Sequence, residues 1–272
     1  MNITNYKPKK RFGQNFLRDS YFAEKIVEAE DITAADTVLE IGPGQGVLTK
    51  LLAGRAGKVL AVELDRDLIP GLKSQFRDCP NVEIINEDIL RFLDSDLRDN
   101  PKTRLVSPSF RPKWRNLSPK DPSTTLGMTS ESGYKVVGSI PYQITSPLIY
   151  KLLNQSDPAE SITILIQREV AEKILTLPPK ATYLSNFVRF FADVKLITKV
   201  PKGAFFPVPK VDGAIIQLKS QKSKVKITAE SWKRFLHQGF THPRQMLNKS
   251  FPPEVLKSVG VDPTRRPGTL TT

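Results

Sequence analysis

The chain has 272 residues and a formal net charge of +13, from 41 lysines and arginines against 28 acidic residues. A single cysteine, Cys79, excludes an intrachain disulfide, and no apolar run approaches the ~18 residues that a membrane-spanning helix needs. Two histidines and one cysteine also argue against a zinc site, and we expect no bound metal.

The positive charge gathers at the two ends of the chain. From Lys219 to Thr272 there are 11 basic residues against three acidic ones, and residues 1–18 hold five basic residues and no acid. This uneven distribution favours a polyanionic partner, usually nucleic acid, over a merely solvating basic surface. The basic N-terminus has no apolar core behind it, unlike a secretory signal, and the lone cysteine suits a reducing compartment. We therefore expect a cytoplasmic protein.

Strands and helices alternate along the first half of the chain. Strand patterns cover residues 36–42, 57–65, 81–88 and 134–139, and helical patterns cover residues 47–54 and 68–76. A helix-start signal follows at Thr145–Pro147. This alternation predicts an α/β sheet with helices on both faces.

The second half predicts the rest of the sheet and a helical end. Residues 161–167 are apolar on both faces, which is typical of a central strand. Residues 194–200 and 211–219 bracket a proline-containing turn and predict an antiparallel pair at the sheet edge. From about Ile227 the pattern becomes helical, amphipathic and basic. We expect residues 1–221 to form one domain and residues 222–272 a small basic helical domain.

One segment, residues 101–133, does not fit this alternation. It holds five prolines and no apolar period, which predicts a long, largely disordered surface loop. Its six basic residues and Trp114 would also suit an RNA-contacting arm. We favour an insertion tolerated at the surface, because nothing in it is patterned like an ordered element.

A glycine-rich segment indicates a nucleoside site. Gly42, Gly44 and Gly46 lie between a strand and a helix, where glycine permits a tight turn and close approach of a ligand. Glu63 ends the next strand, where a carboxylate can accept hydrogen bonds from both hydroxyls of a ribose. A dinucleotide fingerprint needs glycine at position 47, which is Val47. The spacing favours a ligand without pyrophosphate, such as S-adenosylmethionine.

Two more features follow strands at the same predicted edge. Asp88 can accept from an adenine amino group or can cap the helix that begins at Ile89, and the sequence leaves both roles open. Residues 136–148 begin as a buried strand that is broken before Tyr142. We expect the Tyr142 ring to face outward and stack on a second base, with the Ile140 carbonyl free to accept. The alternative is a ring buried beneath a helix.

Together these segments resemble the bacterial small-subunit ribosomal RNA adenine dimethyltransferases, over nearly the whole chain outside the insertion. The resemblance rests on KKRFGQNFL, VLEIGPGQGVLT, VELD, NEDIL, GSIPYQITSPLI, QREVAEKI, FFPVPKVDGAIIQL and VGVDPTRRPGTL. It implies a Rossmann-like sheet of seven strands with a small helical C-terminal domain, and S-adenosylmethionine as cofactor. The implied reaction is N6,N6-dimethylation of two adjacent adenines near the 3′ end of 16S RNA in the immature small ribosomal subunit. We expect the protein to be a monomer.

The resemblance also implies roles for individual residues. Asn15 and Leu17 close over the cofactor, Gly42 and Gly44 line it, Glu63 holds its ribose and Asp88 its adenine amine. The implied catalytic segment is Ser139, Ile140, Pro141 and Tyr142, with Ser139 also beside the cofactor. Phe205 or Phe206 would flank the target base opposite Tyr142.

The chain departs from the family in three places. Ser139 stands where the family has asparagine, the insertion precedes that strand, and the chain stops at Thr272, where the family usually continues with another helix. The C-terminal domain is therefore expected to be truncated. Serine reaches less far than asparagine by about one bond length, ~1.5 Å.

Two alternatives remain beside the dimethyltransferase interpretation. Ser139 raises the possibility of a ribosome-assembly factor that binds RNA with weak or no methyltransferase activity. A related enzyme acting on large-subunit RNA is the other alternative, and the segment DPTRRPGTL argues against it by its resemblance to the small-subunit family.

Overall fold

The computed structural model describes residues 6–9, 12–94, 133–155, 158–221 and 229–270. Apart from Gly133, the predicted insertion at 101–133, with Trp114, lies outside these residues. The described strands are β1 (Phe16–Leu17), β2 (Thr37–Ile41), β3 (Lys58–Glu63), β4 (Val82–Asn86), β5 (Tyr134–Ser139), β6 (Ser161–Gln167), β7 (Ala192–Val200), β8 (Phe205–Phe206) and β9 (Gly213–Ser220). The described α-helices are α1 (Ser20–Ala29), α2 (Val47–Ala53), α3 (Ile69–Gln75), α4 (Ile89–Phe92), α5 (Thr145–Leu153), α6 (Arg168–Leu175), α7 (Tyr183–Phe191), α8 (Ala229–Phe240) and α9 (Pro253–Ser258).

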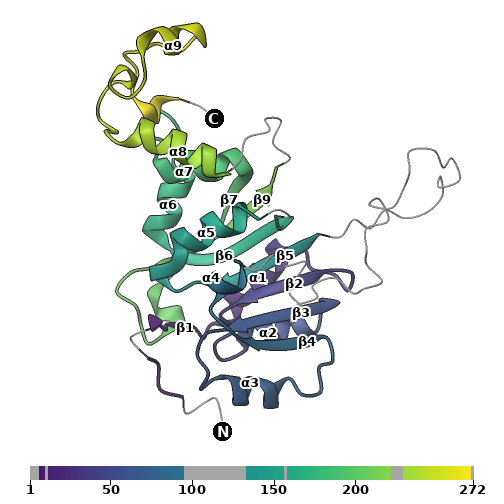
Figure 1. Ribbon diagram of the computed structural model, residues 1–272. Coiled ribbons are helices and arrows are strands. Elements are labelled where there is room, and N and C mark those ends of the chain that lie inside the picture. The colour runs from purple at the N-terminus through teal and green to yellow at the C-terminus, as the bar shows by residue number, and fades with distance from the viewer. Residues whose placement is uncertain (1–5, 10–11, 95–132, 156–157, 222–228, 271–272) are drawn as a thin grey trace, which may run out of the picture.

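The core of the protein is a seven-stranded sheet in the order β4-β3-β2-β5-β6-β9-β7, which confirms the predicted α/β class (Figure 1). The strands from β4 to β6 in that order are parallel, and β9 is antiparallel to both β6 and β7. The chain steps outward from β2 to β3 and β4, then returns to place β5 on the other side of β2. The strand order therefore reverses between β2 and β5, which is where open α/β sheets bind ligands.

The strands on the C-terminal side of the sheet match their sequence patterns. Every residue of β6 except Gln167 is buried, in keeping with a central strand between β5 and β9. The predicted antiparallel pair is β7 with β9. Of the two, only β7 is at the edge, because β9 lies between β6 and β7.

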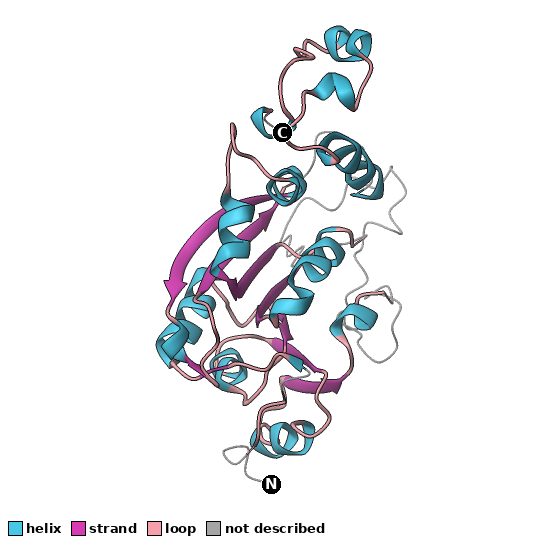
Figure 2. Ribbon diagram, turned by 90° about the vertical axis from the view of Figure 1, so that its left-hand side faces the viewer, coloured by secondary structure: helices cyan, strands magenta, loops and turns pink. Residues whose placement is uncertain are grey.

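Helices cover both faces of the sheet, as the alternation predicted (Figure 2). Helices α1 and α2 bury Ile26 and Leu52 against one face. Helices α4 to α7 cover the other face, and Phe92, Leu148 and Phe187 are fully buried there. Two apolar layers thus fix the sheet and leave the carboxyl ends of its parallel strands to form a site.

The C-terminal helical segment is confirmed from residue 229 onward, and residues 222–228 lie outside the described part. Helix α8 packs on α7, where Trp232 stacks on Phe190 with ring centroids 4.3 Å apart. Leu236 of the same helix is buried with the main core. Helix α9 lies further out, at the end of the molecule opposite α3 (Figure 1).

Candidate active site

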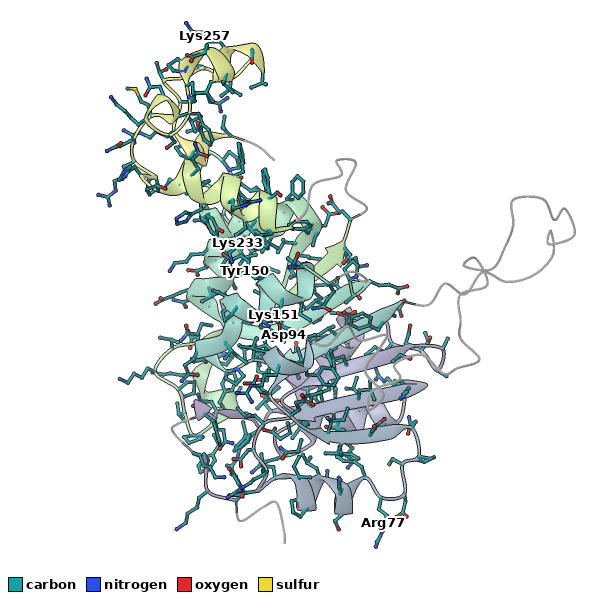
Figure 3. All side chains as sticks on the ribbon, viewed as in Figure 1. Arg77, Asp94, Tyr150, Lys151, Lys233 and Lys257 are labelled. Carbon is teal, nitrogen blue, oxygen red and sulfur yellow. The ribbon has the colours of Figure 1, made fainter. Side chains whose placement is uncertain are left out.

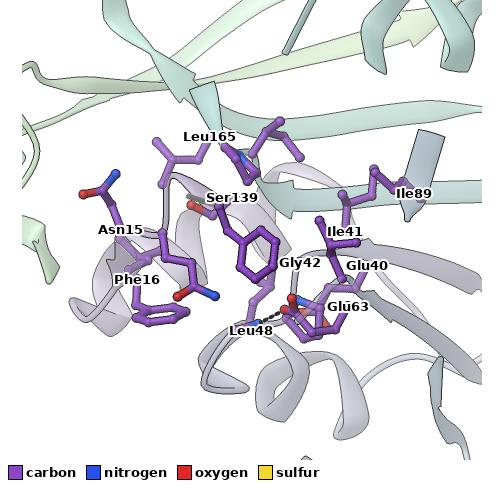
Figure 4. A pocket seen from close by; sticks show the side chains of 18 of the residues that line it. Asn15, Phe16, Glu40, Ile41, Gly42, Leu48, Glu63, Ile89, Ser139 and Leu165 are labelled. Carbon is purple, nitrogen blue, oxygen red and sulfur yellow. Dashed lines mark hydrogen bonds between the residues drawn. The ribbon is translucent and has the colours of Figure 1, made fainter. Parts of the chain in front are cut away.

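One pocket lies at the carboxyl ends of β2, β3, β4 and β5, at the point where the strand order reverses. It brings together the following residues predicted from the sequence: Asn15, Leu17, Gly42, Gly44, Glu63, Asp88, Ser139, Ile140, Pro141, Tyr142 and Phe205. Asn15 and Phe16 lie on one side of it, and Glu40 and Glu63 on the other (Figure 4). Residues separated by up to 193 positions in the sequence thus share one cavity.

The glycine loop adopts a backbone that other residues rarely reach. Gly42, Gly44 and Gly46 have φ angles of 67°, 57° and 80°, all in the left-handed region. A Cβ atom on Gly44 would also lie 2.8 Å from the Phe16 ring. Glycine at position 44 is therefore needed for the turn and for the close approach of the N-terminal segment.

Glu63 ends β3 with its carboxylate turned toward the glycine loop. The residue is only 7% exposed, and it accepts hydrogen bonds from the Gly44 N–H at 3.1 Å and the Asp65 N–H at 2.8 Å. Burial raises the pKa of this carboxyl, and the backbone hydrogen bonds oppose that rise. The two bonds fix the orientation of the carboxylate at the pocket wall.

Of the two roles that the sequence left open for Asp88, the structure shows the helix cap. Its Oδ1 atom accepts from the Leu90 N–H at 2.8 Å, which caps the short helix α4. The same residue lines the pocket. Capping holds the carboxylate in place at the end of β4, one strand beyond Glu63.

The segment after β5 turns sharply into a helix. The Ile140 N–H donates to the Leu165 carbonyl at 2.9 Å, and the Ile140 side chain is only 3% exposed. The Pro141 carbonyl accepts from the Ile144 N–H, which closes a 3₁₀ turn over residues 142–144. This anchoring leaves Ser139 and Tyr142 on the pocket wall.

Tyr142 is less exposed than the sequence suggested. The residue is half-buried, and its hydroxyl is buried with no hydrogen-bond partner among the described residues. Burial raises the pKa of this hydroxyl, and the charge of Asp212 adds to the effect. Tyr142 lines the pocket, but its hydroxyl end does not face solvent.

The two neighbouring phenylalanines differ in position. Strand β8 pairs antiparallel with β1, with Phe205 opposite Leu17 and Phe206 opposite Phe16. Phe205 is 4% exposed and lines the pocket, whereas Phe206 is 41% exposed and does not. The Arg18 guanidinium lies 4.1 Å from the centre of the Phe206 ring.

Sequence reasoning missed Glu40, which lies inside β2 and lines the pocket. It is 1% exposed, and neither of its carboxylate oxygens has a hydrogen-bond partner among the described residues. Burial raises its pKa to about 8, against the opposing effect of the Thr49 side chain and backbone, and the nearby charge of Glu63 adds to the rise. An acid within an otherwise apolar strand was the available signal.

Sequence reasoning also missed how the N-terminal segment is held. Lys9, which was counted with the basic end expected to meet nucleic acid, is paired with Asp65 and Asp67 instead. Phe12, Gln14 and Phe16 line the pocket beside the predicted Asn15 and Leu17. These contacts join residues more than 50 positions apart, so no local pattern reveals them.

Within the described part of the chain, no group of three or more metal-ligating side chains comes together. A search of the same residues found no helix with the length and apolarity needed to cross a bilayer.

Comparisons with known proteins agree with this geometry. A family model described as "Ribosomal RNA adenine dimethylase" matches residues 5–262. A ribosomal RNA small subunit methyltransferase A from Alkaliphilus oremlandii is 34% identical over 98% of this chain and 88% of its own length. The protein of the same name from Pelotomaculum thermopropionicum is 35% identical over 97% of this chain and 87% of its own length.

Solved structures show the same fold. A dimethyladenosine transferase from Plasmodium falciparum superposes with a TM-score of 0.72 at 23% identity, covering 94% of this chain and 92% of its own. The 23S rRNA methyltransferase ErmE superposes with a TM-score of 0.65 at 26% identity, covering 94% of this chain and 96% of its own.

Proposed function

The chain belongs to the ribosomal RNA adenine dimethylase family, and on that premise we propose that it methylates two adjacent adenines near the 3′ end of 16S RNA at N6, twice each. The observation that supports this most is the single pocket in which the glycine loop and Glu63 lie beside the segment from Ser139 to Tyr142. A nucleoside site and a site for a second base share one cavity, as transfer between two bound molecules requires.

The pocket suits S-adenosylmethionine. This cofactor supplies an electrophilic methyl group on a positively charged sulfur. Glu63 is proposed to hold the ribose and Asp88 the adenine amine, and the open backbone at Gly42 leaves room for the remainder.

The second half of the pocket is proposed to hold the target adenine. Tyr142 and Phe205 both line the cavity, and a planar base is well held by aromatic rings. Phe206 is proposed to lie at the entrance, because it is exposed beneath Arg18, a residue able to contact a phosphate.

Ser139, Ile140 and Pro141 are proposed to position the adenine amine. The lone pair of this amine is delocalised into the ring, so acceptors that bind its hydrogens are needed to direct the lone pair at the methyl group. The Ser139 hydroxyl and the Ile140 carbonyl are the candidate acceptors, and a water can bridge the shorter reach of serine. After transfer the amine is strongly acidic and can lose its proton to water, so the site needs no dedicated base.

RNA contact is proposed to come mainly from the C-terminal part. We propose that residues 222–272 are a small basic domain and that residues 1–221 are the catalytic domain. Described basic side chains of this C-terminal part extend from Lys233 on α8 to Lys257 near the end of α9 (Figure 3). Lys233 also lies 5.6 Å from the centre of the Tyr150 ring, which ties this surface to α5. The proposed substrate is the immature small ribosomal subunit. We propose that the protein acts on it as a monomer in the bacterial cytoplasm.

Neither alternative is favoured. A binding factor without activity would not need the intact pocket, and the relatives that match nearly the whole chain are named as methyltransferases. These small-subunit relatives match 97–98% of this chain at 34–35% identity.

The direct test is methyl transfer from labelled S-adenosylmethionine to purified ribosomal particles. Immature small subunits should become labelled in their 16S RNA, and large subunits should not. Labelling of large subunits alone would replace the substrate assignment. Binding of small subunits without any transfer would support the assembly-factor alternative.

A further inference from the structure

The described part of the N-terminal segment, residues 6–9 and 12–17, forms a strap along the pocket. The strap touches the glycine loop through Phe16, which packs against Gly44. It touches the loop after Ser139 through Gly13, where a Cβ atom would lie 2.3 Å from the Gln143 side chain. At its C-terminal end it pairs with β8. The strap therefore spans both halves of the pocket.

Asp65, in the turn after β3, holds the other end of the strap. Its Oδ1 atom accepts from the Lys9 ammonium at 2.6 Å, and its Oδ2 atom accepts from the Gln14 amide at 2.8 Å and from the Tyr6 hydroxyl. The Tyr6 ring in turn meets the Phe16 ring edge-on, with centroids 5.9 Å apart. Three donors from the strap thus converge on one carboxylate.

The charge of Asp65 makes this attachment specific. The Asp65 side chain is only 1% exposed, and burial by itself would raise its pKa, but hydrogen bonds from Lys9 and Tyr6 lower it to about 2. The carboxylate is therefore ionised at neutral pH, and a buried charge of this kind requires partners. The strap supplies the cation and two of the hydrogen bonds.

The same residue is joined to the cofactor site. The Asp65 N–H donates to the Glu63 carboxylate, whose other oxygen accepts from Gly44. Asp65 therefore both binds the strap and orients the Glu63 carboxylate. A cofactor in this pocket would therefore lie against the strap.

We propose that Asp65 is a positioning residue that anchors the strap over the pocket and so slows release of the cofactor; this rests on the proposed function. The simpler explanation is that Asp65 only shapes its own turn, since it also accepts from the Asp67 N–H at 3.1 Å. Asp65→Asn separates the two, because the amide oxygen still accepts from Asp67 while the negative charge that binds Lys9 is lost.

Two further variants test the attachment of the strap to Asp65. Asp67→Asn removes the second, exposed partner of Lys9 and leaves Asp65 intact, so it serves as the matched control. Tyr6→Phe removes one hydrogen bond to Asp65 and keeps the ring that meets Phe16.

The first measurement is trypsin cleavage after Lys9 in the folded protein without cofactor. Asp65→Asn should be cleaved about ten-fold faster than the wild type, as expected for loss of a charge-assisted hydrogen bond, and Asp67→Asn should be cleaved at nearly the wild-type rate. Equal cleavage of wild type and Asp65→Asn would overturn the anchor.

The second measurement is the rate at which bound S-adenosylmethionine is released on dilution into excess competitor. Asp65→Asn should release it about ten-fold faster, with Tyr6→Phe between it and the wild type, and the kinetic loss should appear in KM for the cofactor rather than in kcat. Equal release rates in wild type and Asp65→Asn, or equal acceleration by Asp67→Asn, would overturn the proposal. Failure of the wild type to bind the cofactor at all would instead refute the proposed function, and the cleavage result would still decide whether Asp65 anchors the strap.

Discussion

The Gly44 N–H donates to the Glu63 carboxylate at 3.1 Å, which joins the loop after β2 to the end of β3. The bond aligns two elements of the proposed cofactor site. Both residues were predicted from the sequence for separate reasons, the glycine for its backbone and the glutamate for its charge. Preorganisation of this kind lowers the entropy lost on binding.

Glu63→Ala should weaken S-adenosylmethionine binding by ~1–3 kcal/mol, because charge-assisted hydrogen bonds to the ribose are lost. Isothermal titration calorimetry measures this directly. Glu83→Gln is the matched control, since Glu83 is an exposed acid on β4 that pairs with Lys58 outside the pocket. An equal loss in both variants would show that general negative charge, rather than a ribose contact, supports binding.

Glu40 should make the ligand-free protein less stable as the pH rises. Its folded pKa of about 8 lies above the ~4.3 of an unfolded glutamate, so the folded state holds an extra proton between these values. The protonated Glu40 contributes fully to the stability of the folded state below pH ~4.3, and this contribution is lost as the pH rises toward 8. The free energy of unfolding falls by at most about 1.4 kcal/mol per pH unit over this range. Thermal melts from pH 5 to 8 should therefore show a flatter decline for Glu40→Gln. Parallel curves of melting temperature against pH for the wild type and Glu40→Gln would contradict the raised pKa of Glu40.

Tyr142 should matter for its ring and not for its hydroxyl. Tyr142→Phe removes a buried hydroxyl that has no partner among the described residues, so melting temperature and activity should be kept or raised. Tyr142→Ala should slow single-turnover methylation by the ~1–3 kcal/mol that stacking on a base contributes. Cofactor affinity, measured alongside, should stay near the wild-type value in both. A large loss of activity in Tyr142→Phe would assign a role to the hydroxyl.

Ser139→Asn should raise the single-turnover rate of methylation. The longer side chain restores an acceptor within reach of the adenine amine, and such a hydrogen bond to developing positive charge contributes ~1.5–3 kcal/mol. Cofactor affinity should change little, because no charge is introduced. A slower Ser139→Asn enzyme would mean that the loop is built around serine and that the amine lies elsewhere.

Much of the sheet and of the pocket could be predicted because the signals are local. Apolar strands such as β6 and glycines with positive φ can be recognised in the sequence from a few consecutive residues. Helix α7 was missed because its aromatic and β-branched residues are poor helix formers, and only the capping box of Thr182 and Ser185 marks its start. The bonds that hold the strap were missed because Tyr6 and Asp65 meet across 59 positions, through packing that no local pattern encodes.

The most direct test of the account is to map N6,N6-dimethyladenine on ribosomal RNA from cells with and without this protein. The account predicts two adjacent dimethylated adenines near the 3′ end of 16S RNA that disappear when the protein is absent and return with the wild-type gene. Unchanged methylation of those adenines, or loss of methylation only in 23S RNA, would contradict it.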